Sequence, residues 1–331
     1  MNIFLLLLNN MKKNIAIITG GDSAEYQISL DSAKIVLDSL SRKKYNSFEI
    51  IVKNNKWILS ENNLELDMTD FSVKINSKKI SFDYAFIVIH GPPAENGDIQ
   101  NYLEQINIPY SSCNSKISKL TFNKFQCNKQ LSKLGFTVAK SMQIVNSKEI
   151  NYNKIIEEIG LPCFVKPNEA GSSYGITKAM SSTDLISGIK KAFTYSKTII
   201  IEKYIQGTEV SCGVYKNNSQ IISLPITEII SQRDFFDYKA KYEGFSEEIT
   251  PANIEKNIYQ TIQNTTIDIY IKMNLRGVCR IDYIIMNNTP YIIEINTIPG
   301  LSKESIIPQQ ISESGTTIEN FLDILIKNTS K

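Results

Sequence analysis

The sequence has little histidine, no paired-cysteine motif and no long apolar run, and each absence excludes a class of protein. His90 is the only histidine in 331 residues, which excludes a metal site built from several histidines. The five cysteines are odd in number and never spaced as CxxC, which predicts reduced, mostly structural thiols in a cytoplasmic protein. The opening IFLLLL is too short to span a bilayer and follows no positive segment, so we expect neither a membrane span nor a signal peptide.

Charge of one sign and the common nucleotide-binding signatures are also lacking. The net charge is +2 and the short basic runs form no stripe, which predicts no nucleic-acid partner. The pattern GxxxxGK[ST] does not occur, so the chain is not a P-loop NTPase. Gly20-Gly21 does not complete GxGxxG, which argues against a nicotinamide-dependent Rossmann enzyme.

The chain does contain an alternation of short apolar strands and helical patterns. NIAIIT and YAFIVIHG are predicted strands, and SLDSAKIVLDSL between them is a predicted helix with one apolar face. This alternation indicates a parallel sheet with functional groups at the carboxyl ends of its strands. With 42% hydrophobic residues, a chain of this length predicts two or three domains.

The sequence also predicts where the folded chain starts and where further helices lie. Met11-Lys12-Lys13 before the first strand is a natural beginning, so residues 1–10 are expected to be a dispensable extension. Further helices are predicted over 118–135, 252–272 and 317–328.

The most informative stretch is the pair of runs CRIDYIIM and YIIEIN, which predicts a β-hairpin around Asn-Asn-Thr-Pro. With 287–289 as the loop, Asp282 lies opposite Glu294 and Arg280 lies opposite Asn296. A slip of the register by one residue would send the two carboxylates to different faces. The alternative is an exposed hairpin that carries ordinary surface acids.

Two carboxylates and an amide oxygen on one face of a sheet repel each other unless a cation lies among them. Hard oxygen ligands without His or Cys favour Mg²⁺, which completes its ligand set with waters and substrate phosphates. The hairpin therefore predicts a divalent-metal site and a substrate that carries phosphate.

A second segment offers groups that bind phosphate. Lys166 ends the predicted strand CFVK, and in the loop that follows Gly171 and Gly175 let backbone N–H groups approach an anion, with two serines between them. Lys124 supplies a second ammonium from its helix. Such a loop is often only a turn, and its combination with the hairpin favours the functional interpretation.

Several short motifs then match a known family in order. VKP, GSSxG, EKxI, RID and ExNTxPG resemble the ATP-grasp superfamily. Within it, the GGxSAExxIS start, the strand-end HG, the loop DYxAKY and the tail PGLSxxS resemble the D-alanine–D-alanine ligase family. The likeness runs from about Asn14 to the last helix.

The resemblance implies a fold and a reaction. The fold is α/β (α+β), a three-domain ATP-grasp architecture with an N-terminal parallel-sheet domain and limits at 11–120, 121–203 and 204–331. ATP lies between the second and third domains. The reaction is the ATP-dependent ligation of two D-alanines through an acyl phosphate for peptidoglycan synthesis, with Mg²⁺ or Mn²⁺, in a homodimer.

The resemblance also assigns roles in binding ATP and metal. Asp282, Glu294 and Asn296 are the implied metal ligands. The implied ATP-binding residues, which grip phosphates or lie near the nucleoside, are Lys124, Lys166, Ser173, Glu202, Lys203, Ile205, Glu209 and Lys241.

For the amino-acid substrates, the resemblance places Glu25 at the ammonium of the first D-alanine and His90 near its carboxylate. The Ser305 hydroxyl and the neighbouring Ile306 hold the carboxylate of the second. The remaining implied catalytic groups are the oxyanion stabilisers Arg280 and the Gly300 N–H, and a triad formed by Glu25, Ser172 and Tyr242. Lys241-Tyr242 also favours dipeptide over D-alanyl-D-lactate synthesis.

Alternatives remain at the level of the sequence. His90 can be a strand-end histidine with satisfied hydrogen bonds, and Glu25 can simply favour a helix N-terminus. Another ATP-grasp ligase with a different amino-acid substrate, or a non-catalytic nucleotide-binding relative, shares part of the pattern. The loop GPPAENG departs from the family at Pro93-Ala94 and at Asn96, which puts the closure of that loop in doubt.

Overall fold

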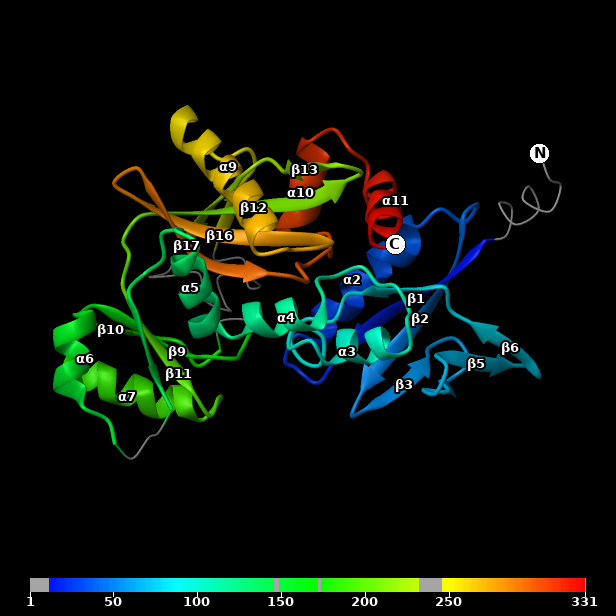
Figure 1. Ribbon diagram of the computed structural model, residues 1–331, viewed down its shortest axis with the longest axis horizontal. Helices are drawn as coiled ribbons and strands as arrows, with labels where there is room; N and C mark the ends of the chain where they lie inside the picture. Colours follow the sequence, from blue (N-terminus) through cyan, green and yellow to red (C-terminus); the bar gives the residue numbers. More distant parts are fainter. Residues whose placement is uncertain (1–11, 146–148, 172–173, 232–245, 331) are drawn as a thin grey trace.

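The computed structural model describes residues 12–145, 149–171, 174–231 and 246–330. Its main sheets belong to three units, coloured blue to cyan, green, and yellow-green to red along the chain in Figure 1. The predicted extension at residues 1–10 lies outside the described residues, and the domain limits at 120 and 203 stay predictions.

The first unit contains the predicted parallel sheet. Its strand order is β4-β3-β2-β1-β7, and β1 pairs in parallel with both β2 and β7. The antiparallel strands β3 and β4 extend one edge, and a separate hairpin, β5–β6, follows. The elements are β1 (Lys13–Gly20), α2 (Tyr26–Ser39), β2 (Tyr45–Lys53), β3 (Lys56–Leu59), β4 (Leu64–Glu65), β5 (Ser72–Ile75), β6 (Lys78–Ser81), β7 (Tyr84–Ile87) and α3 (Asp98–Gln105).

The second unit is a small antiparallel sheet in the order β10-β9-β11-β8, with two helices packed against it. Its elements are β8 (Ser141–Ile144), α6 (Tyr152–Ile159), β9 (Cys163–Pro167), β10 (Thr177–Ala179), α7 (Ser182–Phe193) and β11 (Ile199–Lys203). A capping box between Ser181 and Asp184 begins α7.

The third unit is an antiparallel sheet in the order β15-β14-β12-β16-β17, with β13 paired to β12. Its strands are β12 (Thr208–Asn217), β13 (Gln220–Ser223), β14 (Thr227–Ser231), β15 (Ser246–Ile249), β16 (Val278–Met286) and β17 (Thr289–Asn296). Its helices are α9 (Lys256–Lys272), α10 (Ile306–Glu313) and α11 (Ile318–Thr329); α10 was not predicted from the sequence.

The helix predicted over 118–135 is two helices, α4 (Ser115–Phe122) and α5 (Lys124–Lys133), so that prediction was wrong. Asn123 interrupts it, because its backbone is extended and its side chain accepts a hydrogen bond from the N–H of Gln126. An Asn cap satisfies the first turn of α5 in this way. The two helices contact α3, β8 and β17, and so connect the three units.

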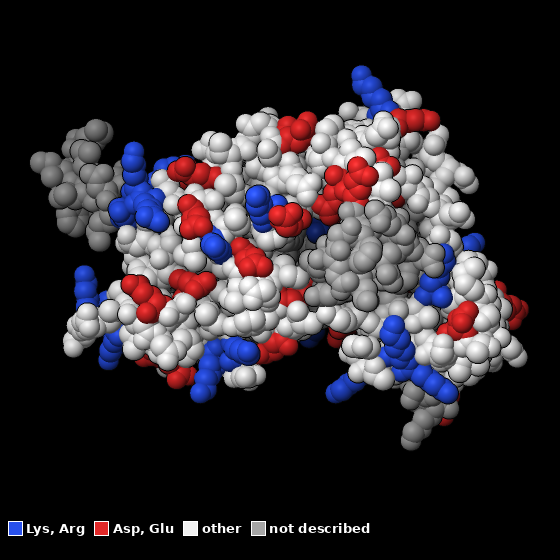
Figure 2. Space-filling view, turned by 180° about the vertical axis from the view of Figure 1, so that it is seen from behind, with Lys and Arg blue, Asp and Glu red and all other residues white. Residues whose placement is uncertain are grey.

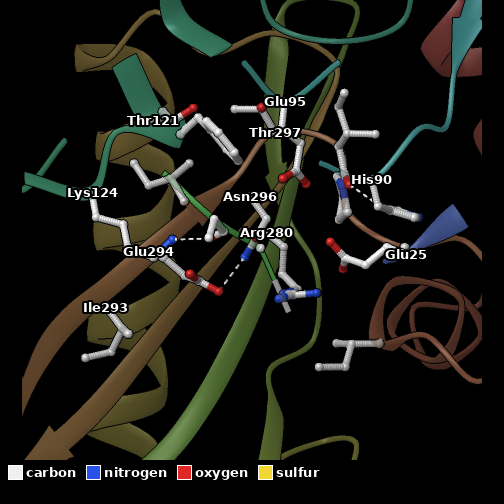
Figure 3. Close-up of a pocket in the computed structure, with 18 of the residues that line it drawn as sticks. Glu25, His90, Glu95, Thr121, Lys124, Arg280, Ile293, Glu294, Asn296 and Thr297 are labelled. Carbon is white, nitrogen blue, oxygen red and sulfur yellow. Dashed lines mark hydrogen bonds between the residues drawn. The ribbon is translucent and has the colours of Figure 1, made fainter. Parts of the chain in front are cut away.

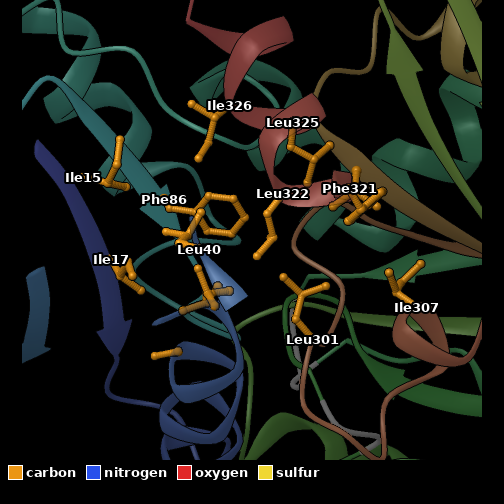
Figure 4. Close-up of a cluster of buried hydrophobic side chains, with 14 of the residues drawn as sticks. Ile15, Ile17, Leu40, Phe86, Leu301, Ile307, Phe321, Leu322, Leu325 and Ile326 are labelled. Carbon is orange, nitrogen blue, oxygen red and sulfur yellow. The ribbon is translucent and has the colours of Figure 1, made fainter. Parts of the chain in front are cut away.

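The first and third units share one hydrophobic core. Helix α11 places Phe321, Leu322 and Ile326 against Ile15 and Phe86 of the first sheet (Figure 4). Phe321 also meets Tyr215 of β12 edge to face, with ring centroids 5.0 Å apart. The C-terminal helix therefore fixes the third sheet relative to the first.

The surface follows the charge pattern of the sequence. On the face shown in Figure 2, Lys and Arg are interspersed with Asp and Glu and form no stripe of one sign. Among the helices in the described part of the chain, none has both the length and the apolar character needed to cross a membrane.

The shared core gives a stability prediction. Leu322→Ala removes a fully buried side chain, so the free energy of unfolding should fall by about 2–5 kcal/mol. The matched control is Ile271→Ala on α9, where the side chain is 56% exposed and the change should stay within about 0.5 kcal/mol. Urea denaturation followed by circular dichroism measures both, and an equally small effect for the two variants would contradict the packing of α11.

Candidate active site

A cavity of about 650 Å³ lies where the three units meet. The first unit contributes Glu25, His90 and Glu95, while Lys124 comes from α5 (Figure 3). The second unit adds Lys166 and the glycine loop, and the third adds the hairpin and the start of α10. The carboxyl ends of β1 and β7 thus open onto the cavity, as the strand–helix alternation predicted.

The two strands of the hairpin pair in the predicted register, but the turn and the strand that produce this register differ from the prediction. Asp282 lies opposite Glu294, and Arg280 opposite Asn296, as expected. However, Thr289 belongs to β17, so the turn has two residues rather than the three predicted. That shorter turn alone would shift the pairing by one residue. A bulge after Asp282 leaves Ile293 without a partner and restores the register.

The turn itself follows from its sequence. Asn287 and Asn288 both have positive φ, 48° and 60°, as a two-residue hairpin turn requires. Asparagine tolerates this conformation better than other residues with a Cβ.

Asp282 is the most heavily bonded group of the hairpin. Arg280 donates to both of its oxygens, from Nε at 2.9 Å and from a terminal nitrogen at 2.8 Å. The Ser211 hydroxyl donates to Oδ1 at 2.6 Å, and Asn296 Nδ2 donates to Oδ2 at 3.0 Å. These donors fix the buried Asp282 carboxylate beside Arg280 and Asn296, which line the cavity.

The donor set of the hairpin suits a hard divalent cation. Two carboxylates and one amide oxygen are available, and Asn296 Nδ2 already spans toward Glu294 Oε1 at 3.5 Å. A cation among them would need the amide turned so that its oxygen faces the carboxylates. The described residues offer no group of three His, Cys, Asp or Glu side chains for a metal. Other oxygens, such as those of phosphate, must therefore complete any ligand shell.

The two predicted lysines come from different units. Lys124 starts α5, and its ammonium donates to the carbonyl of Ala170 in the glycine loop at 2.7 Å. Lys166 is the last residue but one of β9, and its ammonium lies 2.6 Å from Glu202. Burial acts to lower the pKa of Lys166, but the adjacent Glu202 carboxylate raises it above its ordinary value. Lys166 therefore stays cationic in the cavity.

Glu202 lines the cavity and also forms the ion pair with Lys166. Its other oxygen accepts a hydrogen bond of 2.6 Å from Asn128. Lys203, Ile205 and Glu209 line the same part of the cavity. The structure thus brings together the described members of the predicted ATP-binding set.

His90 has both ring nitrogens engaged within the protein. Nδ1 lies 3.2 Å from the carbonyl of Ile298 and Nε2 lies 3.3 Å from the Ser32 hydroxyl. Burial lowers the pKa of His90, although the Glu25 carboxylate acts in the opposite direction. The neutral ring lines the cavity and connects the end of β7 to the segment after β17. His90 is therefore both a residue of the site and a strand-end histidine with satisfied hydrogen bonds.

Glu25 precedes α2 but does not cap it through its side chain. Its carboxylate instead lines the cavity beside the glycine loop. A Cβ at Gly171 would lie 2.5 Å from Glu25 Oε2, so any larger residue there would displace the Glu25 carboxylate from its position. The interpretation of Glu25 as a residue that only favours the helix N-terminus therefore does not account for its position.

The start of α10 forms another wall of the cavity. Ser305 precedes the helix, its hydroxyl lies 2.7 Å from that of Ser302, and Ile306 is the first helical residue. A Cβ at Gly300 would lie 2.5 Å from Ser305 Oγ, so a larger residue here would displace the Ser305 hydroxyl. No acceptor among the described residues takes the backbone N–H of Gly300.

Four predicted site residues, Ser172, Ser173, Lys241 and Tyr242, lie outside the described residues. Two others were missed by the sequence analysis. Glu95 lies five residues after His90, within the loop where only the neighbouring positions drew notice. Glu248 on β15 accepts a 2.6 Å hydrogen bond from Gln309 on α10 and lines the cavity, where burial raises its pKa.

Comparisons with known proteins agree along most of the chain. A family profile described as D-ala D-ala ligase N-terminus matches residues 14–113, and one described as D-ala D-ala ligase C-terminus matches residues 128–327. The D-alanine–D-alanine ligase of Flavobacterium johnsoniae is 47% identical, over 93% of this chain and 96% of that protein. The one of Phocaeicola vulgatus is 42% identical, over 96% and 99%.

Solved structures show the same similarity. D-alanyl-alanine synthetase A from Vibrio cholerae superposes with a TM-score of 0.87 at 26% identity, over 96% of this chain and 98% of that one. VanG D-Ala:D-Ser ligase from Enterococcus faecalis gives 0.86 at 28% identity, over 96% and 100%. The chain has the ATP-grasp fold and belongs to the D-alanine–D-alanine ligase family.

Proposed function

We propose that the protein ligates two D-alanines to D-alanyl-D-alanine with ATP, through an acyl phosphate of the first D-alanine, in the synthesis of peptidoglycan precursors. One observation carries the proposal: Glu294 and Asn296 of the hairpin, Arg280 and two lysines face a single cavity, and Asp282 lies directly opposite Glu294. The relatives named D-alanine–D-alanine ligase, which match nearly the whole chain, support the same reaction.

The chemistry needs these charges because joining a carboxylate to an ammonium is unfavourable in water. Both ions are well solvated, and the group to be lost is hydroxide. Transfer of the γ-phosphoryl group of ATP to the carboxylate of the first D-alanine makes an acyl phosphate and ADP. The amine of the second D-alanine then attacks the carbonyl, and phosphate leaves.

The positive groups of the cavity act on the transferring phosphoryl group. Lys124 and Lys166 bind the phosphates of ATP, and Arg280 neutralises charge that develops during the transfer. Asp282, Glu294 and Asn296 hold the divalent cation, which we propose to be Mg²⁺, with Mn²⁺ able to use the same oxygens. The positive charge of the cation offsets the negative charge of the ATP phosphates. Lys203, Ile205 and Glu209 surround the nucleoside, with Glu202 beside Lys166.

The two amino acids use opposite walls. Glu25 binds the ammonium of the first D-alanine, and His90 orients it. The Ser305 hydroxyl and the N–H groups at the start of α10 bind the carboxylate of the second, because a helix N-terminus favours an anion. Arg280 and the Gly300 N–H stabilise the tetrahedral oxyanion.

Further parts of the proposal rest on residues outside the described ranges or on the family. Ser172 and Tyr242 form the triad with Glu25, and Ser173 and Lys241 contact ATP. We also propose a homodimer in the cytoplasm, a compartment that suits five free, buried cysteines. Light scattering of the purified protein should give twice the mass of the chain.

The reaction can be tested directly. Purified protein with ATP, Mg²⁺ and D-alanine should release phosphate and form the dipeptide, each in equal amount, because one ATP activates one carboxylate. D-Serine serves as a competing second substrate, as in the name of the Enterococcus relative. Phosphate release that requires an amino acid other than D-alanine would contradict the substrate.

Arg280 gives a sharper test of the mechanism. Arg280→Ala should lower kcat by a factor of about 10²–10³, the loss typical for one oxyanion donor, while ATP still binds. The matched control is Arg42→Ala, an arginine exposed on the surface, which should retain full turnover. Phosphate release measures turnover and calorimetry measures ATP binding; wild-type turnover in Arg280→Ala would contradict its role.

A further inference from the structure

Glu95 lines the cavity, and none of the roles proposed above uses it. It lies in the loop between β7 and α3, which hydrogen bonds of the backbone hold in a turn. The N–H of Glu95 donates to the carbonyl of Gly91 at 3.0 Å, and the N–H of Gly97 donates to that of Ala94 at 3.0 Å. The side chain is therefore presented to the cavity by a rigid backbone.

Glu95 and Glu25 face the same point. A Cβ placed on Gly171 would lie 2.5 Å from Oε2 of Glu25 and 3.9 Å from Oε2 of Glu95. The backbone N–H of Gly91 donates to the Glu95 carboxylate, and no side chain among the described residues donates to either acid. Two neighbouring carboxylates in a desolvated wall repel each other, so one of them holds a proton unless a cation joins them.

The raised pKa of Glu95 is consistent with the lack of a cation beside this pair. Burial and the Glu25 carboxylate raise the pKa of Glu95 to about 8, against the opposing effect of Lys124. The Lys124 ammonium donates to the carbonyl of Ala170 rather than to Glu95. Among the described residues, no cationic side chain therefore pairs with these two acids.

The donor substrate carries a cation of the right kind. An ammonium has three N–H donors and can serve two carboxylates at once. In D-alanine the ammonium and the carboxylate share one carbon, so they cannot lie far apart. When the carboxylate faces Arg280 and the hairpin, the ammonium must lie at the wall formed by Glu25 and Glu95.

We propose that Glu95 binds the ammonium of the donor D-alanine together with Glu25, and that this second carboxylate helps the site to reject donor acids without an amino group. The inference rests on the proposed function. Binding of the ammonium lowers the pKa of Glu95, because an opposite charge favours the ionised carboxylate. The loop GPPAENG thus keeps a substrate-binding group despite its departures at Pro93-Ala94 and Asn96.

The test isolates the donor site of the full-length enzyme. With ATP, Mg²⁺ and D-alanine, hydroxylamine acts as a neutral acceptor, and hydroxamate formation reports the acyl phosphate. Glu95→Gln keeps the shape of the side chain, and should raise the KM for D-alanine as donor about tenfold or more, as expected for a lost hydrogen bond between charged groups. The KM for ATP should stay within about twofold.

A second readout separates recognition of charge from packing. D-Lactate lacks an ammonium, and its competition with D-alanine as donor is measured in the hydroxylamine assay, where its inhibition constant should be the same for wild type and Glu95→Gln. The matched control is Glu157→Gln on the exposed side of α6, which should change neither constant. Thermal unfolding of each variant checks that the fold is retained.

Three results would overturn the inference while wild type remains active. They are an unchanged KM for D-alanine in Glu95→Gln, an equal rise in the KM for D-alanine and the inhibition constant of D-lactate, and recovery of the variant by added Mg²⁺. A wild-type protein that makes no hydroxamate from D-alanine would instead contradict the proposed function, and the inference with it.

Discussion

The site depends on two carboxylates that face each other across a β-hairpin. Asp282 and Glu294 are opposite neighbours on β16 and β17, and like charges in such a pair destabilise a sheet. Arg280, Ser211 and Asn296 compensate by donating hydrogen bonds to Asp282. The remaining demand for positive charge is what makes the hairpin suited to a cation and a phosphate substrate.

The rest of the molecule positions other groups against this hairpin. The core shared by α11 and the first sheet holds Glu25 and His90 opposite the third unit. The close approach at Gly171 brings the glycine loop against Glu25, and the one at Gly300 folds the segment between β17 and α10 onto Ser305; a Cβ at either glycine would lie 2.5 Å from a side-chain oxygen. Donor and acceptor walls are thus fixed by packing, while the hairpin supplies the charge between them.

Much of this could be predicted from the sequence, because local patterns encode it. Apolar alternation predicted the parallel strands, and ordered short motifs predicted the family. The details of the hairpin turn were harder to predict. Asn287-Asn288 favours a two-residue turn, but the bulge at Ile293, which restores the register, depends on how β17 packs. The break at Asn123 was hidden because the apolar pattern continues through it, and a single cap residue is a weak signal.

Long-range pairs were inaccessible for a different reason. Lys166 meets Glu202 across the neighbouring strands β9 and β11, and Glu95 approaches Glu25 between two loops of the first unit, in each case from positions far apart in the sequence. No spacing along the chain records such meetings. Glu95 in particular lies in an irregular loop, where no periodicity distinguishes a cavity-facing acid from an exposed one.

The most direct test of the hairpin is anomalous diffraction from crystals grown with ADP, Mn²⁺ and D-alanine. The account predicts an anomalous peak bonded to Asp282, Glu294 and Asn296, with the asparagine amide turned so that its oxygen faces the metal. A peak elsewhere in the cavity, with these three side chains bonded only to one another and to Arg280, would contradict it.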